Sequence, residues 1–561
     1  MMIMKNNILN IFGRLWVVAA GAAIVTSCSL EEDMKSNYAP DNFYRDAAEC
    51  EAGLNGCYIP QRSIFNGTYM LVTEAPSDIM YINSGTYDAI LDISPANPRF
   101  GNTMWNNGYL GVMRSNCIIA AIDRVNLPDS EKVPLYTEGL ILRAFYYWVL
   151  TCNFGDVPFY TDEIMTTADQ LRIAKLPRMS AVDTRRYCFE ELEKWLPNEY
   201  NVQQRTFEDG TEYRMGVAVG YMVAAKLAMW NASAERLNPD AQTFKKEHPY
   251  HKPYEGAEYW WRKALDMLDH LEAIYGDLQQ YPVSDIPFSR KFTPESIWEN
   301  SNIYDEQGLA VTTNVACFYT PTRKSSEGTD AGFGRDAIYD GIEIPNLGAY
   351  ARTYTAFRPN TYFYQQLQPF TNRNDKRQFI NMAWGWDTAA DTADPDSPGF
   401  KFFNGPKSET GRPWMGRKFW CPGMRNTSDG NNHKIFRYAG AVLMQAECWL
   451  MLGDKNKSAD YLNKVRARAG LGPVSPSNYR NTAAFMTEIQ KECGRELIGE
   501  FQRKHDLVRW GIFYQSVLDN NNLQKVRDNI LPCHEYYPIP DRQVSYSGGA
   551  LDNKAYAEYG M

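Results

Sequence analysis

Several features that would assign a function directly are missing from this sequence. After the first thirty residues, no segment is long and apolar enough to cross a bilayer as a helix, which takes about 20 residues. No basic block stands out, and 58 Lys and Arg against 67 Asp and Glu give a net charge of −9, so nucleic acid is not expected as a partner. The six histidines do not cluster and no cysteine pair follows CxxC or a zinc spacing, so we expect no metal site and no cofactor.

The eleven cysteines first suggest a disulfide framework, but their spacing argues against one. Cys50 and Cys57 lie seven residues apart on a predicted helix, and others stand singly in apolar runs. Cysteine without a disulfide is among the residue types most often buried. We therefore expect mostly buried thiols, with a disulfide as the alternative. The cysteines in apolar runs are Cys117, Cys152, Cys188, Cys448 and Cys493.

The first thirty residues have the pattern of an export signal. Lys5 and Arg14 supply a positive start, and the eleven apolar residues of 15–25 match the hydrophobic core of a secretory signal. Small residues then lead directly to Cys28, which resembles a bacterial lipobox, in which cleavage leaves the cysteine as the lipidated first residue. We expect a signal peptide over 1–27 and lipidation at Cys28. An ordinary signal peptide with an incidental cysteine is the alternative.

An acidic run follows the predicted anchor. Glu31, Glu32 and Asp33 lie in a stretch, 28–40, that we expect to be a flexible tether. The run resembles the surface-export signal of Bacteroidetes lipoproteins, and a solvated linker is the alternative. Since no later segment is apolar enough to span a membrane, we expect a body held to the outer membrane by its lipid and facing the cell surface.

Helical periodicity dominates the rest of the chain and predicts a mostly α fold. The clearest pair of amphipathic helices spans Arg437 to Ala469 and is broken at Gly453-Asp454, and a second pair joins 214–236 to 257–274. Such pairs resemble the tetratricopeptide repeat, so we expect a scaffold of helical hairpins. Further helices are predicted over 140–150, 181–196 and 482–500.

Between residues 277 and 435 the character of the sequence changes. Gly, Pro, Asn, Asp and aromatic residues mix with little periodicity, over a stretch too long for a simple connection in a compact domain. Long ordered loops on a rigid scaffold commonly carry function. We therefore expect an N-terminal helical scaffold over 41–276, a loop-rich ligand-binding region over 277–435, and a C-terminal helical part over 436–561.

Four blocks of sequence stand out along the chain. They are Arg143-Ala-Phe-Tyr-Tyr-Trp148 leading to Phe154-Gly-Asp-Val-Pro158, then Ile435 to Glu447, Arg495 to Gly511, and Tyr537-Pro-Ile-Pro540. In this order, and together with Cys28, they resemble the SusD/RagB family of Bacteroidetes outer-membrane lipoproteins over nearly the whole mature chain. The resemblance implies a lid over a TonB-dependent outer-membrane transporter. Such a lid captures oligosaccharides, or in some branches peptides, and performs no chemistry on them.

The chain departs from the family pattern at two places. Gly440 stands where the family usually has Glu, and Lys504-His505 stands where it favours an aromatic residue. Neither position is one that we assign to ligand binding. We therefore expect these changes to alter only local packing.

Charged residues three to four apart in the third block could be catalytic carboxylates or a structural network. On a helix this spacing favours ion pairs, and a lone buried charge is costly, so Arg143 and Glu447 in apolar helices also need partners. We expect a structural network, and core packing for the tryptophans of the helical and capping segments. The charged residues are Glu496, Glu500, Arg503, Asp506 and Arg509, and the tryptophans are Trp105, Trp148 and Trp510.

Two loop regions mix aromatic residues with Asn, Asp and Arg, as a glycan site requires for the apolar face and the hydroxyls of a sugar. The first is 78–88, continuing to 97–100. The second is 304–420, where Gly between two tryptophans lets the backbone present an indole face outward. Aromatic residues that pin the loops to the scaffold are the alternative. The second region contains Tyr319, Tyr354, Arg358, Tyr362, Trp384, Trp386, Asp387 and Trp414.

We predict four ligand-binding residues from these regions, and no catalytic residue. They are Asn83, Tyr87, Trp384 and Trp386. A helical glycoside hydrolase is one alternative, but it needs two carboxylates roughly 5–10 Å apart, and no carboxylate motif indicates such a pair. An adaptor repeat protein is another, although a plain helical solenoid has short connections. A peptide-binding member of the family would use aromatic loops equally well.

Overall fold

The computed structural model describes most of the chain from residue 44 onward. The described ranges are 44–82, 90, 92–205, 210–237, 249–303, 312–319, 337–339, 342–344, 356–369, 372–382, 384–386, 400–402, 415–421 and 427–561. Cys28, the acidic run, Asn83 and Tyr87 lie outside these ranges. Over the described residues, no helix combines the length and the apolar character that a membrane crossing needs.

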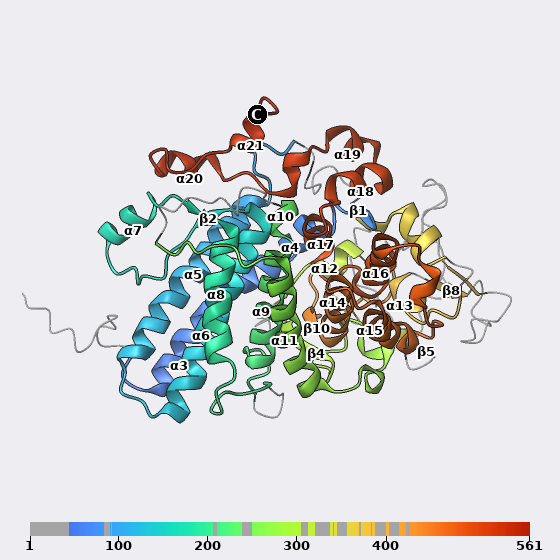
Figure 1. The fold of residues 1–561 in the computed structure, drawn as a ribbon, viewed down its shortest axis with the longest axis horizontal. Helices are drawn as coiled ribbons and strands as arrows, with labels where there is room; N and C mark the ends of the chain where they lie inside the picture. Colours follow the sequence, from blue (N-terminus) through green and yellow to red (C-terminus); the bar gives the residue numbers. More distant parts are fainter. Residues whose placement is uncertain are drawn as a thin grey trace, which may run out of the picture.

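The N-terminal half is a row of helices, each packed on the next (Figure 1). α5 (Gly101–Arg124) lies between α3 (Ala47–Phe65) and α6 (Asp129–Phe154), and α6 also packs on α8 (Ala181–Trp195). α9 (Val217–Ala232) follows against α8. The hairpins of this row confirm the predicted tetratricopeptide-like scaffold.

The row continues into the C-terminal half. α11 (Ala257–Tyr275) packs on both α9 and α14 (Tyr438–Met451), and α14 packs on α15 (Lys455–Arg468) and α16 (Thr482–Leu497). Asp454 caps α15, since its side chain accepts from the backbone N–H of Lys457. Shorter helices, α17 (Arg503–Arg509), α18 (Phe513–Asn520), α19 (Gln524–Asn529), α20 (Asp541–Tyr546) and α21 (Lys554–Ala557), end the chain.

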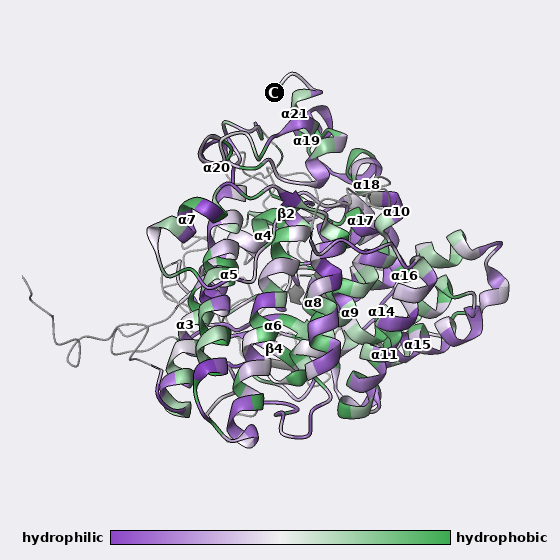
Figure 2. Ribbon diagram, turned by 60° about the vertical axis from the view of Figure 1, so that its left-hand side comes forward, coloured by the Kyte–Doolittle hydropathy of each residue, from purple (hydrophilic) through white to green (hydrophobic). Residues whose placement is uncertain are grey.

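Close helix contact in the scaffold depends on small residues. A side-chain carbon at Gly111 of α5 would lie 2.4 Å from ring atoms of Tyr146 on α6, so the two helices fit together only with glycine there. Hydrophilic and hydrophobic residues alternate along α3 and α5 (Figure 2), as expected for helices with one face in the core, whereas α6 is buried all round from Thr137 to Phe154. One hydrophobic cluster runs from Cys50 to Leu551 and therefore joins both halves.

Short strands connect segments that are distant in sequence. β4 (Ser296–Asn300) pairs antiparallel with β10 (His433–Arg437), and β1 (Met80–Ile82) pairs antiparallel with β7 (Phe357–Pro359). The described elements within 277–435 have at most five residues each, which explains why no period shows in that sequence. The other pairs are β2 (Val157–Pro158) with β3 (Arg178–Met179), β5 (Ala337–Tyr339) with β6 (Ile342–Ile344), and β8 (Trp384–Trp386) with β9 (Phe400–Phe402).

The cysteines behave as buried hydrophobic residues. Of the ten that the structure describes, none forms a disulfide, and eight are buried. Burial raises the pKa of Cys57 and of Cys152 to about 12, so both thiols stay protonated at neutral pH. The prediction of buried thiols is confirmed for this part of the chain.

Candidate functional site

The β1–β7 ladder brings together the two loop regions predicted to bind ligand. Met80 pairs with Pro359 and Ile82 with Phe357, so the chain runs directly from β1 into the segment of Asn83 and Tyr87. The same end of the ladder receives the second loop region, which enters β7 at Phe357. The ladder therefore gives the two regions a common base, although they lie far apart in sequence.

Two buried carboxylates fix the first strand to the third family block. Asp78 accepts two hydrogen bonds from the Arg503 guanidinium, both 2.7 Å long. Glu74 accepts from the backbone N–H groups of Gly499, Gln502 and Arg503 at 3.0–3.2 Å. Burial raises the pKa of Glu74 to about 7 in spite of these donors. The base of the loops is thus attached to the scaffold through groups that have no access to solvent.

A buried amide fixes the second strand. The side-chain nitrogen of Asn360 donates to the carbonyl oxygens of Ser77 and Met80 at 3.1 and 3.0 Å, and its oxygen accepts from the backbone N–H of Asn522 at 2.9 Å. The backbone N–H of Asn360 also donates to the oxygen of Ile79 at 2.8 Å. Asn360 therefore joins β1, β7 and the α18–α19 connection, a role that nothing in the local sequence indicates.

Several aromatic and polar residues of the second region belong to the core. Tyr319 is fully buried and stacks between Phe357 and Phe419, with ring centroids 4.6 and 4.0 Å away. Arg358 is buried at 3% exposure, and Tyr362 is partly exposed. For Tyr319 and Arg358, the alternative of pinning the loop to the scaffold is confirmed.

The Trp384-Gly-Trp386 sequence forms a strand. β8 pairs antiparallel with β9, with Trp384 opposite Phe402 and Trp386 opposite Phe400. The register thus pairs each tryptophan of this sequence with a phenylalanine of the neighbouring strand. Tyr354, Asp387 and Trp414 lie outside the described residues.

The charges of the family blocks form buried ion pairs. Arg437 bonds Glu295 at 2.8 Å, Glu496 at 2.9 Å and Glu500 at 2.7 Å, and all four side chains are at most 1% exposed. Burial alone would raise the pKa of Glu496, but Arg468 and Arg437 hold it well below its usual value. The predicted structural network is therefore confirmed.

Each of the two lone charges predicted to need a partner has one. Arg143 bonds Glu191 on α8 at 2.6 Å. Glu447 on α14 accepts from Arg509 at 2.8 Å and from the indole nitrogen of Trp510 at 3.1 Å. Trp105, Trp148 and Trp510 are 3–5% exposed, which confirms their predicted packing in the core.

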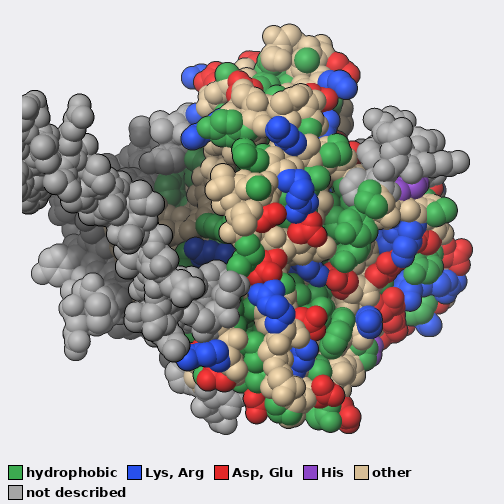
Figure 3. Space-filling view, turned by 90° about the vertical axis from the view of Figure 1, so that its left-hand side faces the viewer, with side chains coloured by type: hydrophobic (Ala, Val, Ile, Leu, Met, Phe, Trp, Pro, Cys, Tyr) green, Lys and Arg blue, Asp and Glu red, His purple; other side chains and the backbone are tan. Residues whose placement is uncertain are grey.

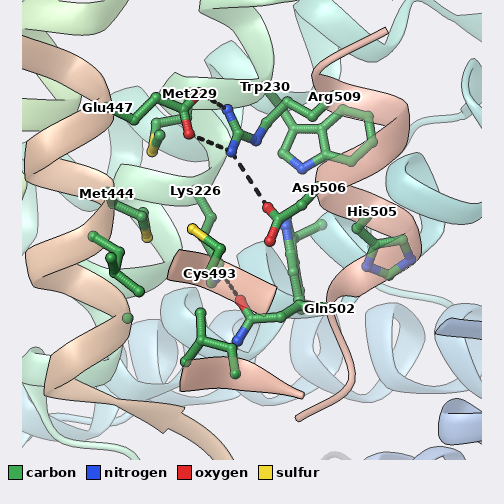
Figure 4. A pocket seen from close by; sticks show the side chains of 14 residues that line it. Lys226, Met229, Trp230, Met444, Glu447, Cys493, Gln502, His505, Asp506 and Arg509 are labelled. Atoms are coloured by element: carbon green, nitrogen blue, oxygen red, sulfur yellow. Dashed lines mark hydrogen bonds and ion pairs between the residues drawn. The ribbon is translucent and has the colours of Figure 1, made fainter. Parts of the chain in front are cut away.

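A small cavity of about 30 Å³, lined by charged and apolar side chains, lies beside these pairs. In Figure 4, Glu447, Arg509 and Asp506 are linked by hydrogen bonds, and Lys226 donates to Gln502 at 3.1 Å. The volume suits about one water molecule and is far below that of a ligand pocket. Gly440, one of the two departures from the family pattern, lines this cavity and leaves room in it.

Neither a metal site nor a patch of charges of one sign is found on the part of the surface that the structure describes and Figure 3 shows. No group of three His, Cys, Asp or Glu residues suited to a metal occurs among the described residues. Lys and Arg side chains are interspersed with Asp and Glu side chains on that face.

Comparison with known proteins identifies the family. Residues 34–215 match the family model described as "Starch-binding associating with outer membrane", and residues 294–556 match the model of the SusD family. The chain belongs to the SusD/RagB family. Two curated SusD-like relatives come from Formosa agariphila. P25 is 22% identical over 94% of this chain and 95% of its own length, and P2 is 20% identical over 91% and 94%.

Solved structures of SusD-like proteins share the fold. Surface glycan-binding protein A from Bacteroides thetaiotaomicron, in complex with laminarihexaose, has a TM-score of 0.63 at 18% identity, covering 90% of this chain and 98% of its own. A laminarin-binding SusD-like protein has a TM-score of 0.64 at 19% identity, with the same coverage. A SusD superfamily protein from Bacteroides vulgatus also reaches 0.64 at 17% identity, covering 90% of this chain and 98% of its own.

Proposed function

We propose that this SusD/RagB chain binds oligosaccharides at the cell surface and delivers them to a TonB-dependent outer-membrane transporter without catalysing a reaction. The observation that carries the proposal is the likeness, over about 90% of the chain, to glycan-binding proteins, one of them in complex with laminarihexaose. The loop segment that follows Ile82 and the one that precedes Phe357 meet at the β1–β7 ladder, and the aromatic residues of the two loop regions are of the kind that a sugar needs.

In this proposal the ligand lies against the loop segments. Trp384 and Trp386 present apolar faces for the sugar rings, and Asn83 and Tyr87 bond the hydroxyls. The β8–β9 register supports the choice of the tryptophans, because it pairs each of them with a phenylalanine of the neighbouring strand. The clamp at Asn360 and the pair of Asp78 with Arg503 keep the base of these segments in place.

The test replaces both tryptophans. We expect Trp384→Ala/Trp386→Ala to weaken oligosaccharide binding at least fivefold per residue, since a stacking contact contributes about 1 kcal/mol. Isothermal titration with a panel of neutral hexasaccharides, including laminarihexaose, measures the affinity. Tyr200→Ala/Tyr259→Ala is the control, because both tyrosines are exposed on the helical scaffold.

Titration with peptides, and incubation with mixed glycans, decide between the classes of ligand and of function. Unchanged affinity in a folded double variant removes the tryptophans from the site. Binding of peptides but of no glycan overturns the oligosaccharide proposal. New reducing ends after incubation with mixed glycans would show a hydrolase instead of a binding protein.

Anchoring through Cys28 completes the proposed function. A lipid there and the acidic tether of 28–40 would hold the body over the transporter at the outer surface. We expect Cys28→Ser to move the protein from the detergent phase to the aqueous phase in a phase-partition assay of whole cells. A transporter that copurifies from outer membranes with the wild-type protein would support the delivery step, and its absence after cross-linking would count against it.

A further inference from the structure

A groove lies between the body of the protein and the C-terminal segment, and residues of the fourth family block line it. Its volume is about 590 Å³, within the range of about 300–1,000 Å³ of small-molecule sites. One wall is the body of the protein, with the turn at 154–156, Arg178 of β3 and the start of α8. The other wall is the C-terminal segment, 532–539 and 552–559, which lies over the body in Figure 1.

Hydrogen bonds hold the two walls in place. Arg178 bonds Asp552 across the groove at 2.8 Å, and the backbone N–H of Tyr537 donates to the oxygen of Asn153 at 2.7 Å. Within the C-terminal wall, the Tyr556 hydroxyl donates to the oxygen of Tyr536 at 2.7 Å. The groove is therefore formed before any ligand arrives, and little ordering free energy is lost on binding.

The lining has the chemistry of a saccharide site. Tyr536 is half-buried in the groove, and Tyr559 at its edge is 42% exposed. An aromatic ring that is partly exposed offers an apolar face for the C–H side of a sugar. Phe154, Tyr537 and Tyr556 are buried behind them.

A carboxylate also lines the groove. Glu535 is partly exposed there, and burial raises its pKa in spite of the nearby charge of Lys504. A partly exposed carboxylate oxygen can accept a hydrogen bond from a sugar hydroxyl.

The charges of the lining exclude an anionic ligand. Arg178 and Lys554 both pair with Asp552, and Arg185 donates to Thr151. The remaining acidic residues, Asp156, Glu535 and Glu558, leave no surplus of positive charge for a phosphate or an acidic polymer. A neutral ligand with several hydroxyls fits both the acceptors and the aromatic rings.

We propose that this groove is a second saccharide-binding site, which takes one end of a neutral oligosaccharide. This proposal rests on the proposed function only for the class of ligand, a neutral oligosaccharide. None of the residues that line the groove belongs to the loop segments. Two separate sites on one chain would let it hold a long glycan at two points, which raises the overall affinity through the effective concentration of the second end.

Hydrogen exchange of the full chain with neutral hexasaccharides, including laminarihexaose at millimolar concentration, tests the groove. We expect slower exchange in peptides that cover 532–539 and 552–559. We expect Glu535→Gln/Tyr559→Ala to weaken that protection about fivefold or more in ligand titration. Tyr546→Ala is the matched control, because Tyr546 is 55% exposed on α20 and does not line the groove.

The two proposed sites can be tested independently of each other. In Trp384→Ala/Trp386→Ala, protection of the groove should persist, and in Glu535→Gln/Tyr559→Ala, binding at the loop segments should persist. The groove proposal is overturned if no hexasaccharide protects these peptides, or if Tyr546→Ala removes the protection equally. Loss of groove protection in the tryptophan variant would also overturn it, since a single site would then explain both signals.

Discussion

The helical core and the base of the ligand segments are held together by different kinds of bond. In the core, the guanidinium of Arg437 meets three carboxylates, and Arg509 meets Glu447, all from side chain to side chain. At the β1–β7 ladder the bonds are mostly from backbone to backbone, or from the Asn360 amide to backbone oxygens. A bond between side chains requires two particular residues, whereas a backbone bond accepts almost any residue.

This difference explains where the family blocks lie. The blocks contain Arg437, Glu447, Glu496 and Arg509, so their sequence is restricted by the ion pairs. β1 and β7 pair through the backbone, although Asp78, two residues before β1, forms a buried ion pair with Arg503 of the third block. Backbone pairing leaves no pattern of residue types, and the blocks therefore do not identify the ligand-binding residues. Four changes to the chain would break or sharpen this comparison.

The largest effect is expected in the core. Arg437→Met leaves Glu295, Glu496 and Glu500 with less compensating charge, and we expect a loss of about 3–5 kcal/mol in the free energy of unfolding. Urea denaturation at pH 7 measures it. Arg262→Met is the control, because Arg262 pairs with Glu258 at 64% and 73% exposure, where about 0.5 kcal/mol or less is expected. Equal losses in the two variants would contradict the importance of burial.

At the ladder, we expect Asn360→Ala to reduce stability less than Arg437→Met does, and to weaken ligand binding more. It removes the partners of three buried backbone groups, and we expect a loss of about 1–3 kcal/mol together with weaker oligosaccharide affinity. Asn529→Ala on the exposed side of α19 should change neither by a measurable amount. If Asn360→Ala destabilises the protein and leaves affinity unchanged, the ladder does not position the site.

Lys504 gives the core a pH dependence. It is 3% exposed, its ammonium lies 4.3 Å from the ring centre of Tyr537, and burial lowers its pKa to about 7. Between pH 7 and its ordinary pKa near 10.5, the unfolded chain binds the proton and the folded one does not. Stability should therefore rise with pH in this window, by up to about 1.4 kcal/mol per pH unit.

Lys504→Met should remove that slope and raise stability at pH 7, as urea denaturation at pH 7, 8 and 9 would show. The exposed Lys525→Met should leave the slope in place. A slope that survives in Lys504→Met must come from another group.

The smallest effect is a gain. Gly440 lies inside α14, and a side-chain carbon there would meet only Met222 at 3.6 Å and Leu497 at 4.0 Å. We expect Gly440→Ala to stabilise the protein by about 0.5–1 kcal/mol, measured as an increase in the urea midpoint. Gly111→Ala should do the reverse, because the new carbon would overlap the Tyr146 ring. If Gly440→Ala instead loses stability, the added methyl group does not fit the small cavity that Gly440 lines.

Much of the scaffold could be predicted from the sequence, because helical periodicity is a local signal. The helices expected at 437–452 and 457–469 are α14 and α15, and the partners required by Arg143 and Glu447 are present. The β1–β7 ladder could not be predicted. Each strand has three residues, too few for an alternating pattern, and the partner strand lies far along the chain.

The candidate site was predicted only in part, for the same reason. The sequence identifies aromatic segments, but it does not separate Tyr319, which fills the core between two phenylalanines, from an aromatic residue on a ribbon face. That distinction depends on tertiary packing. The functions of Glu74 and Asn360 are equally invisible, since each bonds to backbone groups that leave no pattern of residue types.

The β1–β7 ladder also affects how such a protein can change over generations. Because its bonds run through the backbone and end at Ile82 and Phe357, an insertion, deletion or replacement beyond these two residues does not disturb the ion pairs below. Ligand preference can then diverge in small steps while the helical body keeps its stability. The chain that follows Ile82 and the chain that precedes Phe357 can therefore change in length and composition across generations while the backbone pairs of the ladder stay available.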